Sequence, residues 1–76
     1  MEERVITIQD EYITLGQLLK VADIIQSGGM ARWYLSEYYV YVNEEEEQRR
    51  GRKLRDGDFI EFPNEALMIQ IKQKNL

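Results

Sequence analysis

The basic residues of this chain are concentrated in one short segment, and their side chains are suited to binding anions. Of ten lysines and arginines, five fall within the seven residues from 49 to 55, namely Arg49, Arg50, Arg52, Lys53 and Arg55. A guanidinium group can bind two phosphate oxygens at once through parallel hydrogen bonds. Gly51, in the middle of the segment, lets the backbone bend or approach a ligand closely. The segment is therefore a candidate phosphate-binding loop.

The rest of the chain is acidic, so the positive charge is local. The formal net charge is −4, and because the segment 49–55 carries +5, the remainder of the chain carries −9. Such segregation creates a local field that the net charge conceals. Four glutamates, Glu44 to Glu47, directly precede the basic segment. Two interpretations stay open: a solvated loop whose arginines pair with these glutamates, or an anion site that the glutamates screen from non-specific polyanions.

The composition also limits the chemistry that the chain can perform. It contains no histidine and no cysteine, which removes Ser-His-Asp and Cys-His catalysis and both imidazole and thiolate metal ligands. Carboxylates remain as ligands for a hard cation such as Mg²⁺. However, four consecutive glutamates on one hairpin point apart rather than converge. We expect no catalytic site, no metal site and no cofactor, and therefore a protein that is not an enzyme.

The length and the ends of the sequence favour one small domain. Seventy-six residues form a single domain, residues 1–76, with a thin core. The first residues, MEERVITIQD, lack the positive region and the apolar run of a signal peptide. No uncharged stretch is long enough to span a membrane. Together with the absence of cysteine, which fits a reducing compartment, these features predict a cytoplasmic protein.

Two segments carry the pattern of short helices. Thr14 and Gln17 form a capping box, and apolar residues at helical spacing follow it, which predicts a helix from about Leu15 to Ala22 with Lys20 on its outer face. A second helix follows Ser27, whose side chain we expect to cap it. Its apolar face is predicted from Ala31, Tyr34, Leu35 and Tyr38.

The second helix offers two further candidate sites. At its start, Gly28 and Gly29 leave the first backbone N–H groups unshielded, which favours either a phosphate or an ordinary cap with a flexible entry. On its outer side, Trp33 could stack on an unpaired base, with Arg32 on the adjacent phosphate. The alternative is that Trp33 packs under the first helix or the N-terminal segment, and the sequence leaves both choices open.

The remaining segments alternate with a period of two and are typical of strands. We expect strands at residues 5–8, 39–42, 59–62 and 67–71, with the side chains of Val40, Val42, Ile60 and Phe62 turned inward. Asn43 ends one strand, and Asp56-Gly57 is a turn signal. Because helices and strands are segregated along the chain, the fold class is α+β, with two short helices packed on a small antiparallel sheet.

The order of these elements resembles a known family. The stretches ITLGQLLKVADIIQSGGMARWYL and VYVNEEEEQRRGRKLRDGDFIEF are similar to the S4 RNA-binding domain, in particular to the small, free-standing S4-like proteins of the YaaA type. The resemblance covers about residues 13 to 62. It implies the S4-like fold, the αL RNA-binding motif. It also implies a surface of two helices and the following hairpin that docks on structured RNA, much of it ribosomal.

Carried over to this sequence, the resemblance implies a set of RNA-binding residues. These are Lys20, Ser27, Gly28, Gly29, Arg32, Trp33, Asn43, Arg49, Arg50, Arg52, Lys53 and Arg55. Two positions depart from the family pattern: Gly28 replaces an arginine, and Glu44 replaces a glycine that usually follows the asparagine. We therefore expect a non-enzymatic RNA-binding module, and the alternative is a protein–protein interaction module in a larger assembly.

Overall fold

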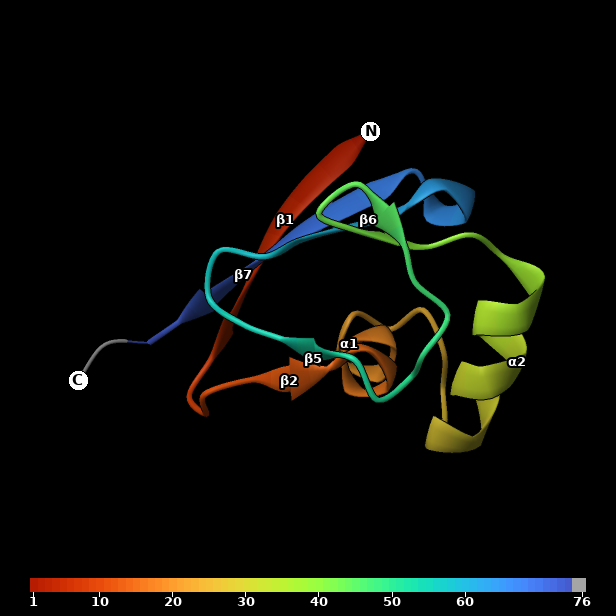
Figure 1. Ribbon diagram of the computed structural model, residues 1–76, viewed down its shortest axis with the longest axis horizontal. Helices are drawn as coiled ribbons and strands as arrows, with labels where there is room; N and C mark the ends of the chain where they lie inside the picture. Colours follow the sequence, from red (N-terminus) through yellow and green to blue (C-terminus); the bar gives the residue numbers. More distant parts are fainter. Residues whose placement is uncertain (75–76) are drawn as a thin grey trace.

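The computed structural model describes residues 1–74 and confirms the α+β fold class (Figure 1). A five-stranded sheet has the strand order β1-β7-β6-β3-β4, and a separate two-stranded sheet joins β2 to β5. The helices and the small sheet lie on one side of the five-stranded sheet (Figure 1). No helix within residues 1–74 is long and apolar enough to cross a bilayer.

The elements follow one another closely along the chain. In order, they are β1 (Glu2–Ile8), β2 (Ile13–Thr14), α1 (Leu15–Val21), the 3₁₀ turn η1 (Gly28–Met30), α2 (Ala31–Glu37), β3 (Tyr41–Val42), β4 (Glu45–Glu46), β5 (Lys53–Leu54), β6 (Phe59–Phe62), the 3₁₀ turn η2 (Pro63–Glu65) and β7 (Leu67–Gln73). Compared with the prediction, β1 is longer than the expected strand at residues 5–8, and β3 is shorter than the expected strand at residues 39–42.

One strand pair departs from the antiparallel sheet that the sequence predicts. The pairs β6–β7, β3–β6 and β3–β4 are antiparallel, but β1 runs parallel to β7 from Glu2 opposite Leu67 to Ile8 opposite Gln73. A parallel pair needs a long crossover connection. Here nearly the whole chain lies between the two strands, so that requirement is met, although no short sequence pattern announces it.

The first helix forms as its capping box predicts. The backbone N–H of Gln17 donates to Oγ1 of Thr14 at 3.2 Å, and the N–H of Thr14 donates to Oε1 of Gln17 at 2.9 Å. These bonds satisfy backbone donors at the helix start. Leu15, Leu18 and Leu19 are fully buried, which confirms the predicted apolar face. The helix ends one residue earlier than expected, at Val21.

The core lies between the helices and the five-stranded sheet. The strand residues predicted to point inward, Val40, Val42, Ile60 and Phe62, are all buried, and Leu54, Ile69 and Ile71 join them in the core. From α2, Ala31, Tyr34 and Leu35 complete it. The hydroxyl of Tyr34 donates to Oε2 of Glu65 at 3.1 Å. Burial, reinforced by this bond, raises the pKa of Tyr34 above its ordinary value.

The turn between β3 and β4 has a defined type, although Glu44 stands where the family usually has glycine. Asn43 and Glu44 both have positive φ, 51° and 72°, in a two-residue connection between paired strands. This combination is typical of a type I′ turn, which favours asparagine and glycine. The Asn43 side chain fixes the turn, because its Nδ2 donates to Oδ1 of Asp58 at 3.0 Å and its Oδ1 accepts from the N–H of Phe59 at 3.0 Å.

Candidate RNA-binding surface

The basic segment is fixed to the start of α1 by its backbone. The N–H of Leu15 donates to the carbonyl of Arg52 at 2.9 Å, and the N–H of Gly16 donates to the carbonyl of Arg50 at 2.8 Å. The first N–H groups of a helix have no partner within the helix. Here the basic segment supplies partners for two of them, Leu15 and Gly16, and Figure 1 shows the connection from β4 to β5 passing beside α1. The segment is therefore positioned by long-range contacts.

Gly16 permits this close approach. A Cβ atom at this position would lie 3.3 Å from the carbonyl oxygen of Arg50 and 3.4 Å from its Cβ. The Cβ of Ala31 on α2 would be 3.6 Å away. Gly16 is absent from the site residues predicted from the sequence. The available signal was a glycine inside a predicted helix, which costs stability unless close packing requires it.

Glu47 organises two of the arginines. Its carboxylate accepts from Nε and Nη2 of Arg49 at 3.0 and 3.1 Å and from Nη1 of Arg52 at 3.0 Å. It also accepts from the backbone N–H of Arg49 at 3.1 Å. The Arg49 side chain, together with the other donors and against the opposing effect of burial, lowers the pKa of Glu47 to about 2. Glu47 is therefore an ion-pair partner inside the loop.

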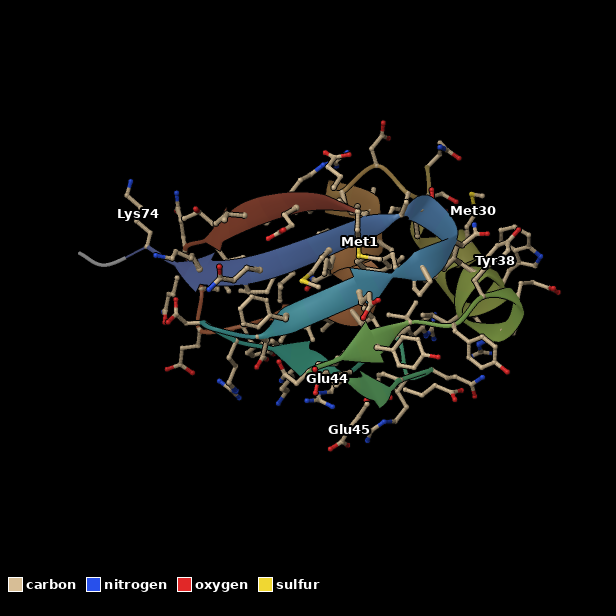
Figure 2. All side chains as sticks on the ribbon, turned by 90° about the horizontal axis from the view of Figure 1, so that it is seen from above. Met1, Met30, Tyr38, Glu44, Glu45 and Lys74 are labelled. Carbon is tan, nitrogen blue, oxygen red and sulfur yellow. The ribbon has the colours of Figure 1, made fainter. Side chains whose placement is uncertain are left out.

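The four neighbouring glutamates do not act as one group. Glu47 is only 7% exposed, whereas Glu44, Glu45 and Glu46 are exposed. Figure 2 shows Glu44 and Glu45 at the edge of the five-stranded sheet. The interpretation in which all four pair with the arginines is wrong, because within residues 1–74 these arginines form ion pairs with Glu47 alone. The screening of non-specific polyanions by these glutamates stays a prediction.

Two of the remaining cations lie over an aromatic ring. Nζ of Lys53 is 4.9 Å, and Cζ of Arg55 is 5.5 Å, from the centroid of Tyr12. Cation–π attraction over such distances holds a cation near a ring. The pairing of β2 with β5, with Thr14 opposite Lys53, brings Tyr12 here. The sequence did not indicate this role of Tyr12, because nothing near it in the chain predicts that pairing.

Two hollows adjoin the basic segment, and one of them extends to the helices. One, about 410 Å³, lies among Thr14, Gly16, Gln17, Lys20, Gly28, Ala31, Arg50 and Gly51. The other, about 460 Å³, is bordered by Arg49, Gly51, Arg52 and Lys53. Because both include Gly51, they form one continuous region. We use the term basic surface for this region and its charged neighbours: Lys20, Gly28, Arg49, Arg50, Arg52, Lys53 and Arg55.

The turn before α2 differs from the expected cap. The Ser27 side chain makes no capping hydrogen bond, and η1, rather than an α-helical turn, follows it. The turn closes instead through main-chain groups, because the N–H of Met30 donates to the carbonyl of Ser27 at 3.0 Å. The predicted serine cap is therefore wrong. Gly29 is exposed in this turn, and only Gly28 borders the basic surface.

Three other predicted residues lie away from both hollows. Arg32 and Trp33 are exposed on α2, with Trp33 50% exposed and its ring edge-on to Tyr38 at 6.0 Å between centroids. This exposure contradicts packing of Trp33 under the first helix. Asn43 uses its side-chain amide to hold the hairpin turn. None of the three borders the two hollows that define the basic surface.

Residues 6–70 match the S4 domain family, and the chain belongs to that family. The match covers most of the chain and confirms the resemblance inferred from its motifs. A curated relative is the probable ribosome maturation protein RlbA of Bacillus subtilis (strain 168). It is 64% identical over 57 residues, which span 75% of this chain and 80% of the relative. Family membership indicates an RNA-binding module rather than an enzyme, as the sequence predicted.

Proposed function

We propose that this chain binds structured RNA, with ribosomal RNA as the leading candidate, and that the basic surface makes the contact. The observation that carries the proposal is the anchoring of the cationic segment to α1 through Leu15 and Gly16. A cationic loop that is already ordered loses less conformational entropy when it binds. The relative's name, which refers to ribosome maturation, supports a ribosomal target.

The cations of the basic surface have different tasks. Arg50, Lys53 and Arg55 form no ion pair among residues 1–74, so their charges are available to phosphates. Glu47 engages two side-chain nitrogens of Arg49 and one of Arg52. A guanidinium has five N–H donors, so each arginine keeps donors for an RNA oxygen. Glu47 therefore orients these arginines at the cost of part of their net charge.

The surface is suited to reading shape rather than base sequence. Phosphate contacts fix the position of a protein on a nucleic acid but carry no direct sequence information. Duplex RNA is recognised mostly through its shape, its phosphates and its 2′-hydroxyl groups. Lys20 on α1 and Arg50 on the loop border the same hollow, so cations from two elements can meet phosphates of one folded RNA. Selectivity would then come from the spacing of those phosphates.

A double charge reversal tests this function. The variant Arg50→Glu/Lys53→Glu leaves the Glu47 ion pairs in place, and both side chains are exposed. Binding of a fluorescent, folded ribosomal RNA fragment would be measured by anisotropy in 0.1 M salt. Removal of one cation–phosphate interaction should weaken binding about fivefold at this salt concentration, so we expect the double variant to bind at least about 25-fold more weakly.

The control variant makes the same change in charge elsewhere. Lys72→Glu/Lys74→Glu alters two exposed lysines near the end of β7, which do not border the basic surface. We expect a much smaller loss of affinity for this variant. Equal losses in the two variants would show that only net charge matters and would refute the assigned surface. A wild-type chain that binds no folded RNA would refute the function itself.

A further inference from the structure

The second large surface is the face of the five-stranded sheet that the helices do not cover. Figure 2 looks onto this face, with α1 behind the sheet and α2 beside its right-hand end. The pairing register places one row of side chains across all five strands: Glu3, Met68, Glu61, Tyr41 and Glu46. Directly paired residues share one face of a sheet. The row therefore alternates a carboxylate with an apolar or aromatic side chain.

The neighbouring row on the same face carries two exposed apolar side chains. Val5 pairs with Gln70, which pairs with Phe59, and Val5 and Phe59 are 57% and 46% exposed. Two hollows, of about 410 and 90 Å³, indent this face and share Phe59 and Met68. Contiguous exposed apolar side chains within a polar rim mark interaction sites on small proteins.

The carboxylates of this face identify the kind of partner. Glu3, Glu46 and Glu61 form no ion pair among the residues that the structure describes. Adjacent strands are about 4.8 Å apart, so carboxylates on alternate strands are about 10 Å apart. A segment in the polyproline II conformation advances about 3.1 Å per residue with three residues per turn, so basic side chains three positions apart lie on one side of it, about 9 Å apart, and match that spacing. A cationic segment would therefore place its basic side chains opposite these carboxylates.

We propose that this sheet face, Val5, Tyr41, Phe59 and Met68 with Glu3, Glu46 and Glu61, docks a protein segment that combines lysine or arginine with apolar side chains. A nucleic acid would be repelled by the three carboxylates, which outnumber Lys72, the exposed cation that the register places on the same face. A second copy of the same face would bring like charges together. The proposal is independent of RNA binding, because the basic surface is built from α1, β5 and the loop before β5.

Titration of the isotopically labelled full chain with a defined peptide tests this proposal. The probe is a ten-residue peptide with lysine at every third position and leucine and threonine elsewhere, and the matched control peptide carries glutamate in place of lysine. Amide chemical shifts should move for Val5, Phe59 and Met68 with the lysine peptide only. In the variant Glu3→Gln/Glu46→Gln/Glu61→Gln, peptide binding should weaken roughly tenfold, as expected for the loss of three exposed ion pairs.

Two further variants separate docking from general attraction of a cation. Asp10→Asn/Asp23→Asn/Glu37→Gln removes three exposed acids outside the sheet face and should change peptide affinity less than about twofold. Phe59→Ser keeps every charge of the face and should weaken binding severalfold, because the exposed ring supplies an apolar contact.

Several outcomes would overturn the docking proposal. One is equal peptide affinity in both triple variants. Another is unchanged peptide affinity in Phe59→Ser. A third is a set of amide chemical-shift changes that centre on acidic residues outside the sheet face. Concentration-dependent shifts of the same amides without peptide would instead assign the face to a second copy. RNA affinity measured on the same variants should stay unchanged, so failure of this proposal is distinguishable from failure of the RNA-binding proposal.

Discussion

The basic segment and the Ser27–Gly29 turn look alike as binding candidates in the sequence, but their backbones are held in different ways in the structure. Both were candidate phosphate sites. The backbone of the basic segment is bound to α1 at Leu15 and Gly16, which lie more than thirty positions away. The turn is closed by the local bond from Met30 to Ser27. This difference shows that a charged segment forms an ordered site where hydrogen bonds from distant parts of the chain fix its backbone.

The largest effect is expected from removing the charge that orders the loop. Glu47→Gln should lower the free energy of unfolding by about 1–3 kcal/mol, because hydrogen bonds from two arginines to a carboxylate are weakened. Urea denaturation measures this change. The neighbouring Glu46→Gln is the control and should change stability by less than about 0.5 kcal/mol, because Glu46 is exposed. Equal effects would show that Glu47 does not order the loop.

The same carboxylate predicts a specific loss of stability in acid. Its pKa is lowered from 4.5 to about 2, so its contribution is complete above pH 4.5 and is lost as the pH falls toward 2. Urea denaturation at pH 5 and at pH 2.5 should therefore show a larger drop for the wild-type chain than for Glu47→Gln. If both chains lose the same free energy between these pH values, the ion pairs of Glu47 do not persist in solution.

A pair of glycine substitutions compares the two regions directly. Gly16→Val should destabilise the fold by about 1–3 kcal/mol, because even a Cβ would lie 3.3 Å from the Arg50 carbonyl. Gly28→Val should cost much less, because nothing lies within 4 Å of a Cβ there. Thermal unfolding of both variants measures the difference. An equal cost would mean that the loop yields to the side chain and is not held tightly.

The smallest effect is expected at the serine of the turn. Ser27→Ala should change the free energy of unfolding by less than about 0.5 kcal/mol, because the side chain makes no capping bond. If the serine capped a helix, the same substitution would lower the free energy of unfolding by about 1 kcal/mol. Denaturation of this variant therefore distinguishes a serine cap from the observed turn. A loss of about 1 kcal/mol would contradict the observed turn.

Much of the fold could be predicted because its signals are local. The Thr14–Gln17 capping box and the alternation around Phe62 each depend on a few adjacent residues. The parallel pairing of β1 with β7 could not be predicted in this way. It joins the two ends of the described chain, and each strand alone is compatible with either direction.

The charged residues of the candidate site could be predicted from the sequence, but the contacts that hold them in place could not. The basic loop is visible in the sequence as a cluster of positive charge. Its supports are Gly16, Tyr12 and Glu47, and each acts through a neighbour that folding supplies. In the sequence, Glu47 is indistinguishable from the three glutamates before it. Only burial beside Arg49 and Arg52 separates it from them.

The salt dependence of RNA binding tests the role of the basic surface most directly. If four or five cations engage phosphates, log K against log salt should have a slope of roughly −3 to −4, so affinity should fall about a hundredfold between 50 and 200 mM salt. In Arg50→Glu/Lys53→Glu the slope should become shallower by about 1.4. A slope near zero for the wild-type chain, or an unchanged slope in the variant, would contradict phosphate binding by this surface.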